Sequence, residues 1–457
     1  MRLASLATLA GLALHFALGY WLGYPFLTDV IAEWIMAKTP SAWAVSLLET
    51  MGEWAKPFAA TGGLATLGFI LWLPAVVMLP AFALVVWGLG YTSWIGVCTF
   101  LAPALLVLHW RKPASSSSRR EFLTSAAMLS GIAVIAVEAY ARNHAKASKA
   151  VEPVHLFDWS VPADRIEWGK GLVRKPVTPV REFYVMSKNT VDPLVDPKSW
   201  RLRVEIDEKP LRDFSYAELL SLPREERFAT MRCISNTLKS DLMGTAAWSG
   251  IHLGQLLRQS ELPSSIVEMA VIGLDGHGDS YRLDYAFSDE PLFALGMNGE
   301  TLNRNHGFPI RMLAPRYYGF KSIKWLERIQ FRTAPYLGTW PKLGYTKEPV
   351  IHTASFVDRI ERAGSKARVG GVSFAGARGV RKVEVRSSGG IWIPMELETP
   401  LSSQTLTRWR GEIEIPSGAE WLEARALDGE GKWQATVEKP IFPDGVSGPT
   451  LKRLPDA

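Results

Sequence analysis

Hydrophobic and polar positions are segregated along this chain, and the pattern changes near residue 150. Residues 3–28 and 57–110 contain no charged side chain, and residues 122–137 form a shorter apolar run. Since a membrane-spanning helix needs about 20 apolar residues, the pattern predicts an α-helical membrane segment over residues 1–141. We expect about four helices in it, over residues 3–28, 57–87, 90–110 and 122–141. The alternative for the fourth run is a buried core helix.

Charged residues between the predicted spans set their orientation. Residues 111–120 contain Arg111, Lys112, Arg119 and Arg120 and no acidic residue. Because short basic loops remain cytoplasmic, the fourth span should deliver everything after about residue 142 to the periplasmic side. Counting back through three spans places the N-terminus outside, whereas Arg2 favours the inside, so that side stays open.

Residues 118–123 read Ser-Arg-Arg-Glu-Phe-Leu and precede a modest apolar run. This motif resembles a twin-arginine export signal, which a receptor reads in order to translocate folded proteins. In the alternative interpretation, Arg119 and Arg120 simply anchor the inner end of a helix. The export interpretation implies that the soluble domain folds around a cofactor before it crosses the membrane.

The soluble part begins with an extended, proline-punctuated linker over residues 142–180 and continues as mixed α+β structure. Ser215 is expected to cap a short helix over 215–222, with Glu218 three residues on. Residues 248–262 should begin in a turn and continue as a helix. Strands are expected at residues 200–206, 266–274, 311–313 and 322–331.

After residue 345 the pattern becomes all-β, with Gly/Ser/Pro turns between short strands. This spacing is typical of a β-sandwich over residues 345–445. Its strands are predicted at residues 369–374, 380–386, 392–397, 409–415 and 421–427.

Composition excludes several classes of protein. The chain has 457 residues, a formal net charge of +6 and two cysteines, Cys98 and Cys233. Two cysteines exclude a disulfide-stapled framework and a multi-cysteine zinc or iron–sulfur site. The mild positive charge lacks a long Lys/Arg stripe, so no nucleic-acid partner is expected. His15 and His109 lie at different depths of the predicted spans, so haem is not expected.

Cys233 is the only thiol of the soluble part and lies in Thr-Met-Arg-Cys-Ile-Ser-Asn at residues 230–236. A lone cysteine is most often a buried, inert residue. Here the Arg232 cation and the donors of Ser235 and Asn236 favour a thiolate, the form that binds metals or attacks. A cysteine hydrolase would need a histidine base, but no protease-like pattern surrounds this cysteine.

A second group of candidates is basic and falls between residues 306 and 324. It comprises His306, Arg311, Lys321 and Lys324, separated by a Gly/Pro turn and short strands. These side chains are either solvated strand ends or converge on an anionic group such as a phosphate.

Six motifs occur in a fixed order along the soluble part. They are Phe-Tyr-Val-Met-Ser-Lys-Asn (183–189), Arg-Cys-Ile-Ser-Asn (232–236), Trp-Ser-Gly-Ile-His-Leu (248–253), Met-Asn-Gly (297–299), His-Gly-Phe-Pro-Ile-Arg (306–311) and Lys-Trp-Leu (324–326). In this order they resemble the molybdopterin-binding domain of the sulfite oxidase family, here over residues 181–344. The sandwich resembles that family's C-terminal immunoglobulin-like domain, through Gly-Val-Ser-Phe-Ala-Gly-Ala-Arg at 371–378.

The resemblance implies a molybdenum–molybdopterin cofactor and assigns residues to it. Cys233 matches the cysteine that ligates molybdenum, for which a soft thiolate is suited. The other cofactor-binding candidates are Lys188, Asn189, Ser235, Asn236, His306, Arg311, Lys321 and Lys324. Lys188, Arg232 and Tyr345 are the candidates for the substrate side, alongside Cys233 as a catalytic residue. The alternative for Tyr345 is an aromatic that packs between domains.

Two departures from the family pattern bear on the site. The animal and plant enzymes have Arg-Asn-His in the first loop, where this chain has Ser-Lys-Asn at residues 187–189, so Lys188 must replace the arginine as a point charge. Lys239 and Ser240 stand where related bacterial proteins have glycines.

The sequence therefore predicts a membrane-anchored periplasmic molybdenum oxidoreductase that carries out sulfite-oxidase-like, two-electron oxygen-atom transfer at Cys233. One alternative is an S-oxide or sulfoxide reductase of the same fold, and another is a non-catalytic, membrane-anchored binding or assembly protein. The expected partners are a small oxyanion or S-oxide substrate, membrane lipid, and a quinone- or cytochrome-linked electron carrier. The resemblance also implies a homodimer.

Overall fold

The computed structural model describes residues 153–188, 192–238 and 242–455 of the chain. The chain divides into two compact units, Met1–Ala150 and Val151–Ala457, and all described residues belong to the second. The four predicted membrane helices and the twin-arginine-like motif lie outside the described residues. Among the helices of the described ranges, none combines the length and the apolar character needed to cross a membrane.

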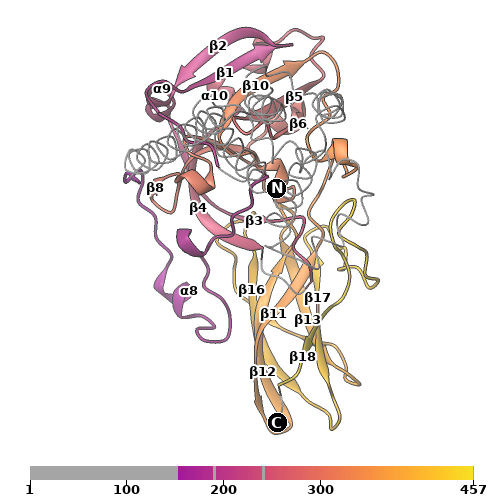
Figure 1. Ribbon diagram of the computed structural model, residues 1–457. Helices are drawn as coiled ribbons and strands as arrows, with labels where there is room; N and C mark the ends of the chain where they lie inside the picture. The colour runs from indigo at the N-terminus through magenta and orange to yellow at the C-terminus, as the bar shows by residue number, and fades with distance from the viewer. Residues whose placement is uncertain (1–152, 189–191, 239–241, 456–457) are drawn as a thin grey trace, which may run out of the picture. The chain divides into compact units, whose positions relative to one another are not determined.

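The residues up to Arg332 form two five-stranded sheets around one hydrophobic core. The first sheet has the order β2-β1-β10-β5-β6, and in the second, β3-β4-β7-β8, strand β9 also pairs with β7. In the first sheet β1 and β10, far apart in the sequence, lie side by side and run parallel (Figure 1). The strands are β1 (Arg201–Ile206), β2 (Lys209–Ser215), β3 (Glu225–Arg232), β4 (Met243–Ile251), β5 (Glu268–Gly273), β6 (Gly278–Arg282), β7 (Leu292–Met297), β8 (Glu300–Thr301), β9 (Arg311–Leu313) and β10 (Leu326–Arg332).

The described helices are short and connect the strands. They are α8 (Ala163–Glu167), α9 (Tyr216–Ser221), α10 (Leu253–Leu256) and α11 (Leu283–Ala286), with 3-10 turns η2 (Val180–Glu182), η3 (Gln259–Glu261), η4 (Arg304–His306), η5 (Gly319–Lys321) and η6 (Pro341–Leu343). Before α9, the Ser215 hydroxyl accepts a hydrogen bond from the Glu218 amide at 3.2 Å, and the Glu218 carboxylate accepts one from the Ser215 amide. This reciprocal cap confirms the predicted helix start.

The region around Trp248 differs from the sequence-based expectation of a turn followed by a long helix. Residues 248–251 belong to the buried strand β4, and α10 is a single turn. Strand β4 pairs with both β3 and β7, and all nine of its residues are buried although Thr245 and Ser249 are polar. A strand that is buried on both faces shows no alternation, so its periodicity does not distinguish it from a buried helix.

The C-terminal part is a sandwich of two four-stranded sheets, whose orders are β11-β12-β16-β15 and β14-β13-β17-β18 (Figure 1). Val369, Trp409 and Ala424 are fully buried in its core. The strands are β11 (Ala354–Ala363), β12 (Lys366–Phe374), β13 (Val380–Ser387), β14 (Ile393–Pro394), β15 (Glu396–Leu397), β16 (Thr407–Glu414), β17 (Trp421–Asp428) and β18 (Thr450–Arg453). All five predicted strand regions contain strands; β11 was not predicted, and β18 lies beyond the expected end at residue 445.

The described part of the predicted linker packs against both of these domains. The Arg408 guanidinium donates to the carbonyls of Arg165 and Trp168, and Arg174 forms an ion pair with Asp358 of β11. Toward the first domain, the Thr178 amide donates to the Thr245 carbonyl at 2.8 Å. The linker is therefore not extended throughout, as it was predicted to be, because α8 and the turns at residues 168–172 lie within it, and it is held along its length.

Close packing in the sandwich gives a direct test of the fold. A Cβ on Gly371 of β12 would collide with the Phe356 carbonyl and lie 2.5 Å from the Trp409 ring. We expect Gly371→Ala to lower the free energy of unfolding by about 2–3 kcal/mol, because neither neighbour is a flexible side-chain end. Gly254→Ala is the control: its Cβ meets no described atom within 4 Å, so in α10 it should be neutral or stabilising. Denaturant unfolding measures both, and equal effects would contradict this packing.

Candidate functional site

Cys233 begins a loop at the end of strand β3. Its amide donates to the Leu242 carbonyl at 2.9 Å, and its carbonyl accepts from the Asn236 amide at 3.2 Å. The Asn236 side chain is 1% exposed, and its Oδ1 accepts from the Leu242 amide at 2.9 Å. Asn236 thus bonds to Cys233 through its amide and to Leu242 through its side chain. These hydrogen bonds hold Cys233 in a turn.

The Cys233 thiol is buried, and burial decides its charge. Burial raises the pKa of the thiol, while the backbone and hydroxyl of Ser235 act in the opposite direction, followed by Arg232. Because burial prevails, the uncoordinated thiol stays protonated at neutral pH, contrary to the expectation that Arg232 favours a thiolate. A bound metal cation would deprotonate it, since a coordinating thiol loses its proton outright.

Arg232 is fully buried, and its guanidinium is used by the protein itself. It donates to the carbonyls of His352 at 3.1 Å and Asn236 at 3.5 Å. It also lies over the rings of Tyr318 and Phe356. This geometry ties the Cys233 loop to the start of the sandwich and does not support the expected contact of Arg232 with a substrate.

His306, Arg311 and Lys324 come together, which rejects the interpretation as solvated strand ends. Arg311 donates to the His306 carbonyl at 3.1 Å, and Lys324 donates to the Asn305 carbonyl at 3.0 Å and to the Ser187 hydroxyl at 2.8 Å. Burial first, and then Arg311, lowers the pKa of His306 to about 4, so this imidazole is neutral at pH 7.

Arg311 is a buried charge without an acidic partner. It is 4% exposed, and it donates only to two carbonyls, those of His306 and Ser322. Burial lowers the pKa of its guanidinium to about 10, which still leaves it charged at neutral pH. Within the described ranges its Nε has no hydrogen-bond partner, and no carboxylate forms an ion pair with it. A buried cation of this kind calls for an anion.

Tyr184 is a site residue that the sequence did not single out. Its hydroxyl oxygen is buried and has no hydrogen-bond partner among the described residues. Burial raises the pKa of this hydroxyl, and the neighbouring Cys233 raises it further, whereas Arg311 acts in the opposite direction. Tyr184 therefore lies within electrostatic reach of both Cys233 and Arg311. An aromatic residue in an apolar run gives no sequence signal beyond core packing.

Lys321 has a different place from the one expected of a cofactor-binding residue. Its ammonium is fully buried and donates to Asp279 Oδ1 at 3.1 Å and to the carbonyls of Ser280 at 2.6 Å and Lys347 at 3.0 Å. These three acceptors use all three of its hydrogens. The geometry gives Lys321 a structural ion pair and does not support a cofactor contact.

Three further residues were predicted for the site, namely Tyr345, Lys188 and Asn189. The Tyr345 ring packs edge-on against Phe320, Trp340 and Phe442, at centroid distances of 6.2, 5.7 and 5.1 Å. The packing alternative for Tyr345 is thus observed, and its role toward a substrate stays a prediction. Lys188 is half-buried, and Asn189 lies outside the described residues.

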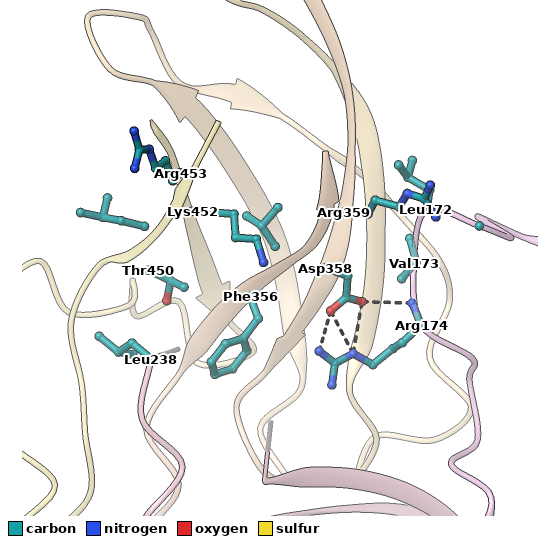
Figure 2. Close-up of a pocket in the computed structure, with 13 residues that line it drawn as sticks. Leu172, Val173, Arg174, Leu238, Phe356, Asp358, Arg359, Thr450, Lys452 and Arg453 are labelled. Carbon is teal, nitrogen blue, oxygen red and sulfur yellow. Dashed lines mark hydrogen bonds and ion pairs between the residues drawn. The ribbon is translucent and has the colours of Figure 1, made fainter. Parts of the chain in front are cut away.

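A separate cavity of about 750 Å³ opens beside the sandwich (Figure 2). Leu238, from the loop that follows Cys233, contributes to its wall, together with Phe356 and Leu172. The Asp358 carboxylate on this wall is paired with Arg174, as Figure 2 shows. Cys233, His306 and Arg311 do not line this cavity, so it is distinct from the site described above.

Comparison with known proteins supports the predicted family. The oxidoreductase molybdopterin binding domain family matches residues 189–340. Human mitochondrial sulfite oxidase is 25% identical over 325 residues, 59% of this chain and 59% of that protein. Sulfite oxidase of Arabidopsis thaliana is 25% identical over 273 residues, 48% of this chain and 69% of that protein. An uncharacterized oxidoreductase of Bacillus subtilis is 27% identical over 165 residues, 36% of this chain and 80% of that protein.

The fold is shared with a solved structure. The sulfane dehydrogenase SoxCD from Paracoccus pantotrophus superimposes with a TM-score of 0.53 at 18% identity, over 68% of this chain and 92% of that chain. The alignment with the human enzyme covers 59% of that protein, so the chain spans about three fifths of its length. Together these comparisons support the predicted molybdopterin-binding domain over residues 189–340, and the shared fold extends beyond it.

The low pKa of His306 predicts how stability depends on pH. Below pH 6.5 the unfolded chain takes up a proton that the folded chain does not, so this contribution to stability is present above pH 6.5 and declines toward pH 4. Between pH 8 and 5 the loss is about 2 kcal/mol. Denaturant unfolding of the cofactor-free protein should show this loss in the wild type and not in His306→Gln. His155→Gln, at an exposed position, is the control and should behave as the wild type.

Proposed function

We propose that this chain, a molybdopterin-dependent oxidoreductase of the sulfite oxidase family, transfers an oxygen atom to a small oxyanion such as sulfite at a molybdenum centre held by Cys233. The observation that carries the proposal is the buried Arg311 cation, which has no acidic partner among the described residues and which acts on Tyr184, as the buried Cys233 thiol also does.

The residues present fit the molybdenum cofactor that such a domain implies. The pterin part carries a phosphate, and the buried Arg311, together with Lys324, supplies positive charge for it. The unpaired Arg311 Nε and Tyr184 hydroxyl are donors that a polar ligand would satisfy. Cys233 offers the one soft ligand, and a single thiolate suits a metal that takes its other sulfurs from the pterin.

When bound, the molybdenum cofactor supplies two-electron oxygen-atom transfer. The chain's own residues hold and tune the site. The Ser235 amide and hydroxyl donate to the Cys233 sulfur, which stabilises its anionic form. The neutral His306 imidazole is held by the Val180 carbonyl at 3.2 Å, so it can remain a hydrogen-bonding partner without adding charge. Half-buried Lys188 is the cation that attracts the substrate oxyanion.

A second candidate function is the reduction of an S-oxide or sulfoxide. It is favoured by Val185 and Met186, which are 44% and 47% exposed directly before Lys188. Two exposed apolar side chains suit a substrate with an apolar part, whereas an inorganic oxyanion has none. Both candidate functions use the same cofactor site and differ in the direction of electron flow.

We further propose the setting in which this reaction occurs. Residues 1–141 anchor the protein in the inner membrane, and the catalytic unit faces the periplasm. A quinone- or cytochrome-linked partner exchanges single electrons with the site, and the sandwich supports a homodimer. The charge-free runs of the N-terminal sequence and the basic segment at residues 111–120 support this proposal.

Metal content is the direct test of the proposed function. Protein purified in detergent from a cofactor-competent host should contain about one molybdenum and one pterin per chain. Cys233→Ser should lose the thiolate-to-metal charge-transfer band and at least about 100-fold of sulfite oxidation with an artificial electron acceptor, because an alcohol is a poor ligand for this metal. Cys98→Ser is the control and should retain both. S-oxide reduction with an artificial donor, without sulfite oxidation, would establish the second candidate. A wild type without molybdenum and pterin would favour a binding or assembly protein.

Export gives a test of the proposed topology. Replacing Arg119 and Arg120 together with lysine should leave the catalytic unit in the cytoplasm, because the receptor reads the arginine pair while the positive charge is kept. Protease protection in spheroplasts measures this: the wild-type unit should be digested and that of the double variant protected. Arg111→Lys, in the same basic segment, is the control and should leave export unchanged. Normal export of the Arg119/Arg120 variant would defeat the proposal.

A further inference from the structure

The hydroxyl of Tyr184 is held in place but has nothing to bond within the described residues. The oxygen is buried and lacks a partner, although the Tyr184 ring is only half-buried. Leaving a buried hydroxyl unpaired costs about 1–3 kcal/mol, so such a group in a native fold needs an explanation.

The ring cannot turn away to relieve this cost. It stacks on Phe183 with a centroid distance of 5.4 Å and an interplanar angle of 18°. Phe183 is itself fixed, since it is 4% exposed and packs edge-on against Trp248 and His306. The Tyr184 hydroxyl is therefore directed by a rigid aromatic cluster that also holds a predicted cofactor-binding residue.

The other side of the hydroxyl is bounded by the backbone next to Cys233. A Cβ built on Gly319 would lie 2.6 Å from the Tyr184 oxygen and 3.3 Å from the Arg232 carbonyl oxygen. Gly319 thus leaves room for the hydroxyl beside the residue that precedes Cys233. The absence of a side chain at position 319 lets Tyr184 reach this point.

The Tyr184 hydroxyl is a hydrogen-bond donor at neutral pH, since a phenol ordinarily keeps its proton there. Arg311, which also acts on Tyr184, supplies donors only. What is missing between these groups is therefore an acceptor of negative character.

We infer that Tyr184 is a positioning residue whose hydroxyl donates a hydrogen bond to the bound cofactor beside Cys233. The inference rests on the proposed function, because it requires the cofactor to occupy this site. It assigns Tyr184 to the metal end of the cofactor, next to the thiol, while His306, Arg311 and Lys324 hold the phosphate end. The hydrogen bond fixes the orientation of the cofactor without changing the reaction that it supplies.

Tyr216 provides a matched control for a purely structural role. Its hydroxyl is also buried and without a partner among the described residues. Its ring packs edge-on against Phe308, and burial raises its pKa to about 12, with Arg224 acting the other way. Neither Cys233 nor Arg311 affects the pKa of Tyr216, so a buried, unpaired hydroxyl is all that the two tyrosines share.

The experiment compares the wild type, Tyr184→Phe and Tyr216→Phe, each made in a cofactor-competent and in a cofactor-deficient host. Without cofactor, both variants should melt at or above the wild-type temperature, since each loses a buried unpaired oxygen. With cofactor, Tyr184→Phe should release molybdenum and pterin about tenfold faster than the wild type, the equivalent of one hydrogen bond to a charged group. Its thiolate-to-metal band should also shift, while Tyr216→Phe keeps the wild-type band and release rate.

The outcomes separate the inference from the proposed function. Loaded Tyr184→Phe with the band and release rate of Tyr216→Phe would overturn the role of Tyr184 and leave the proposed function intact. A wild type that contains neither molybdenum nor pterin would overturn the proposed function and, with it, this inference. Cofactor-free Tyr184→Phe that melts well below the wild type would show that the oxygen is structural, which also overturns it.

Gly319→Ala gives an independent test of the same hydrogen bond. Its methyl group would crowd the Tyr184 oxygen at 2.6 Å while leaving the hydroxyl in the chain. In the wild-type background it should accelerate cofactor release about tenfold, because the donor is displaced. In the Tyr184→Phe background it should add little, since the oxygen that it displaces is absent. Equal effects in both backgrounds would overturn the inference.

Discussion

The buried guanidinium of Arg311 is the constraint on which the candidate site depends. Its terminal nitrogens are held by the carbonyls of His306 and Ser322, which belong to two segments on either side of the strand β9 in which Arg311 lies. Its plane also faces the Trp248 ring, with 5.4 Å between the guanidinium carbon and the ring centroid. Carbonyl dipoles and an aromatic face reduce the cost of burying the charge but do not neutralise it.

The same domain contains a second buried cation that the fold neutralises completely. Lys321 pairs with Asp279, and the Tyr281 hydroxyl donates to the Lys321 carbonyl, so the charge is balanced within the protein. Burial still raises the pKa of Asp279, and Lys321 opposes this rise. Lys321 and Arg311 are ten residues apart in the sequence but differ in how their charges are balanced. The charge of Lys321 is balanced by Asp279, whereas the charge of Arg311 is left for a bound anion to balance. This contrast separates Arg311 from Lys321. Arg232 also donates to two carbonyls without an ion-paired carboxylate among the described residues, so what marks Arg311 as functional is its place beside His306 and Lys324.

Much of this arrangement follows from the sequence, and the exceptions have physical reasons. The Ser215 cap and the sandwich strands depend on local chemistry and alternation, so the sequence predicts them. Strand β4 around Trp248 was assigned wrongly because a doubly buried strand has no period to detect. Lys321 was grouped with Arg311 in the sequence analysis because both are basic and close in the chain. Their roles differ only through the pairing of Lys321 with Asp279, which lies 42 positions before it in the sequence. Tyr184 lies within the first of the six motifs, but no role was predicted for it, since its importance lies in a partner that is missing from the described residues.

The charges around Cys233 connect loading of the site to folding. Without cofactor the thiol is neutral and Arg311 is uncompensated, so this region carries positive charge in a buried setting. A bound metal would convert the thiol to a thiolate, and an anionic cofactor would offset Arg311, so both charges become paired in one event. Binding to the folded state alone stabilises it by an amount that grows with the logarithm of the affinity. A domain built in this way gains stability when it is loaded with cofactor, and loading before export is the order of events that the proposed twin-arginine route requires.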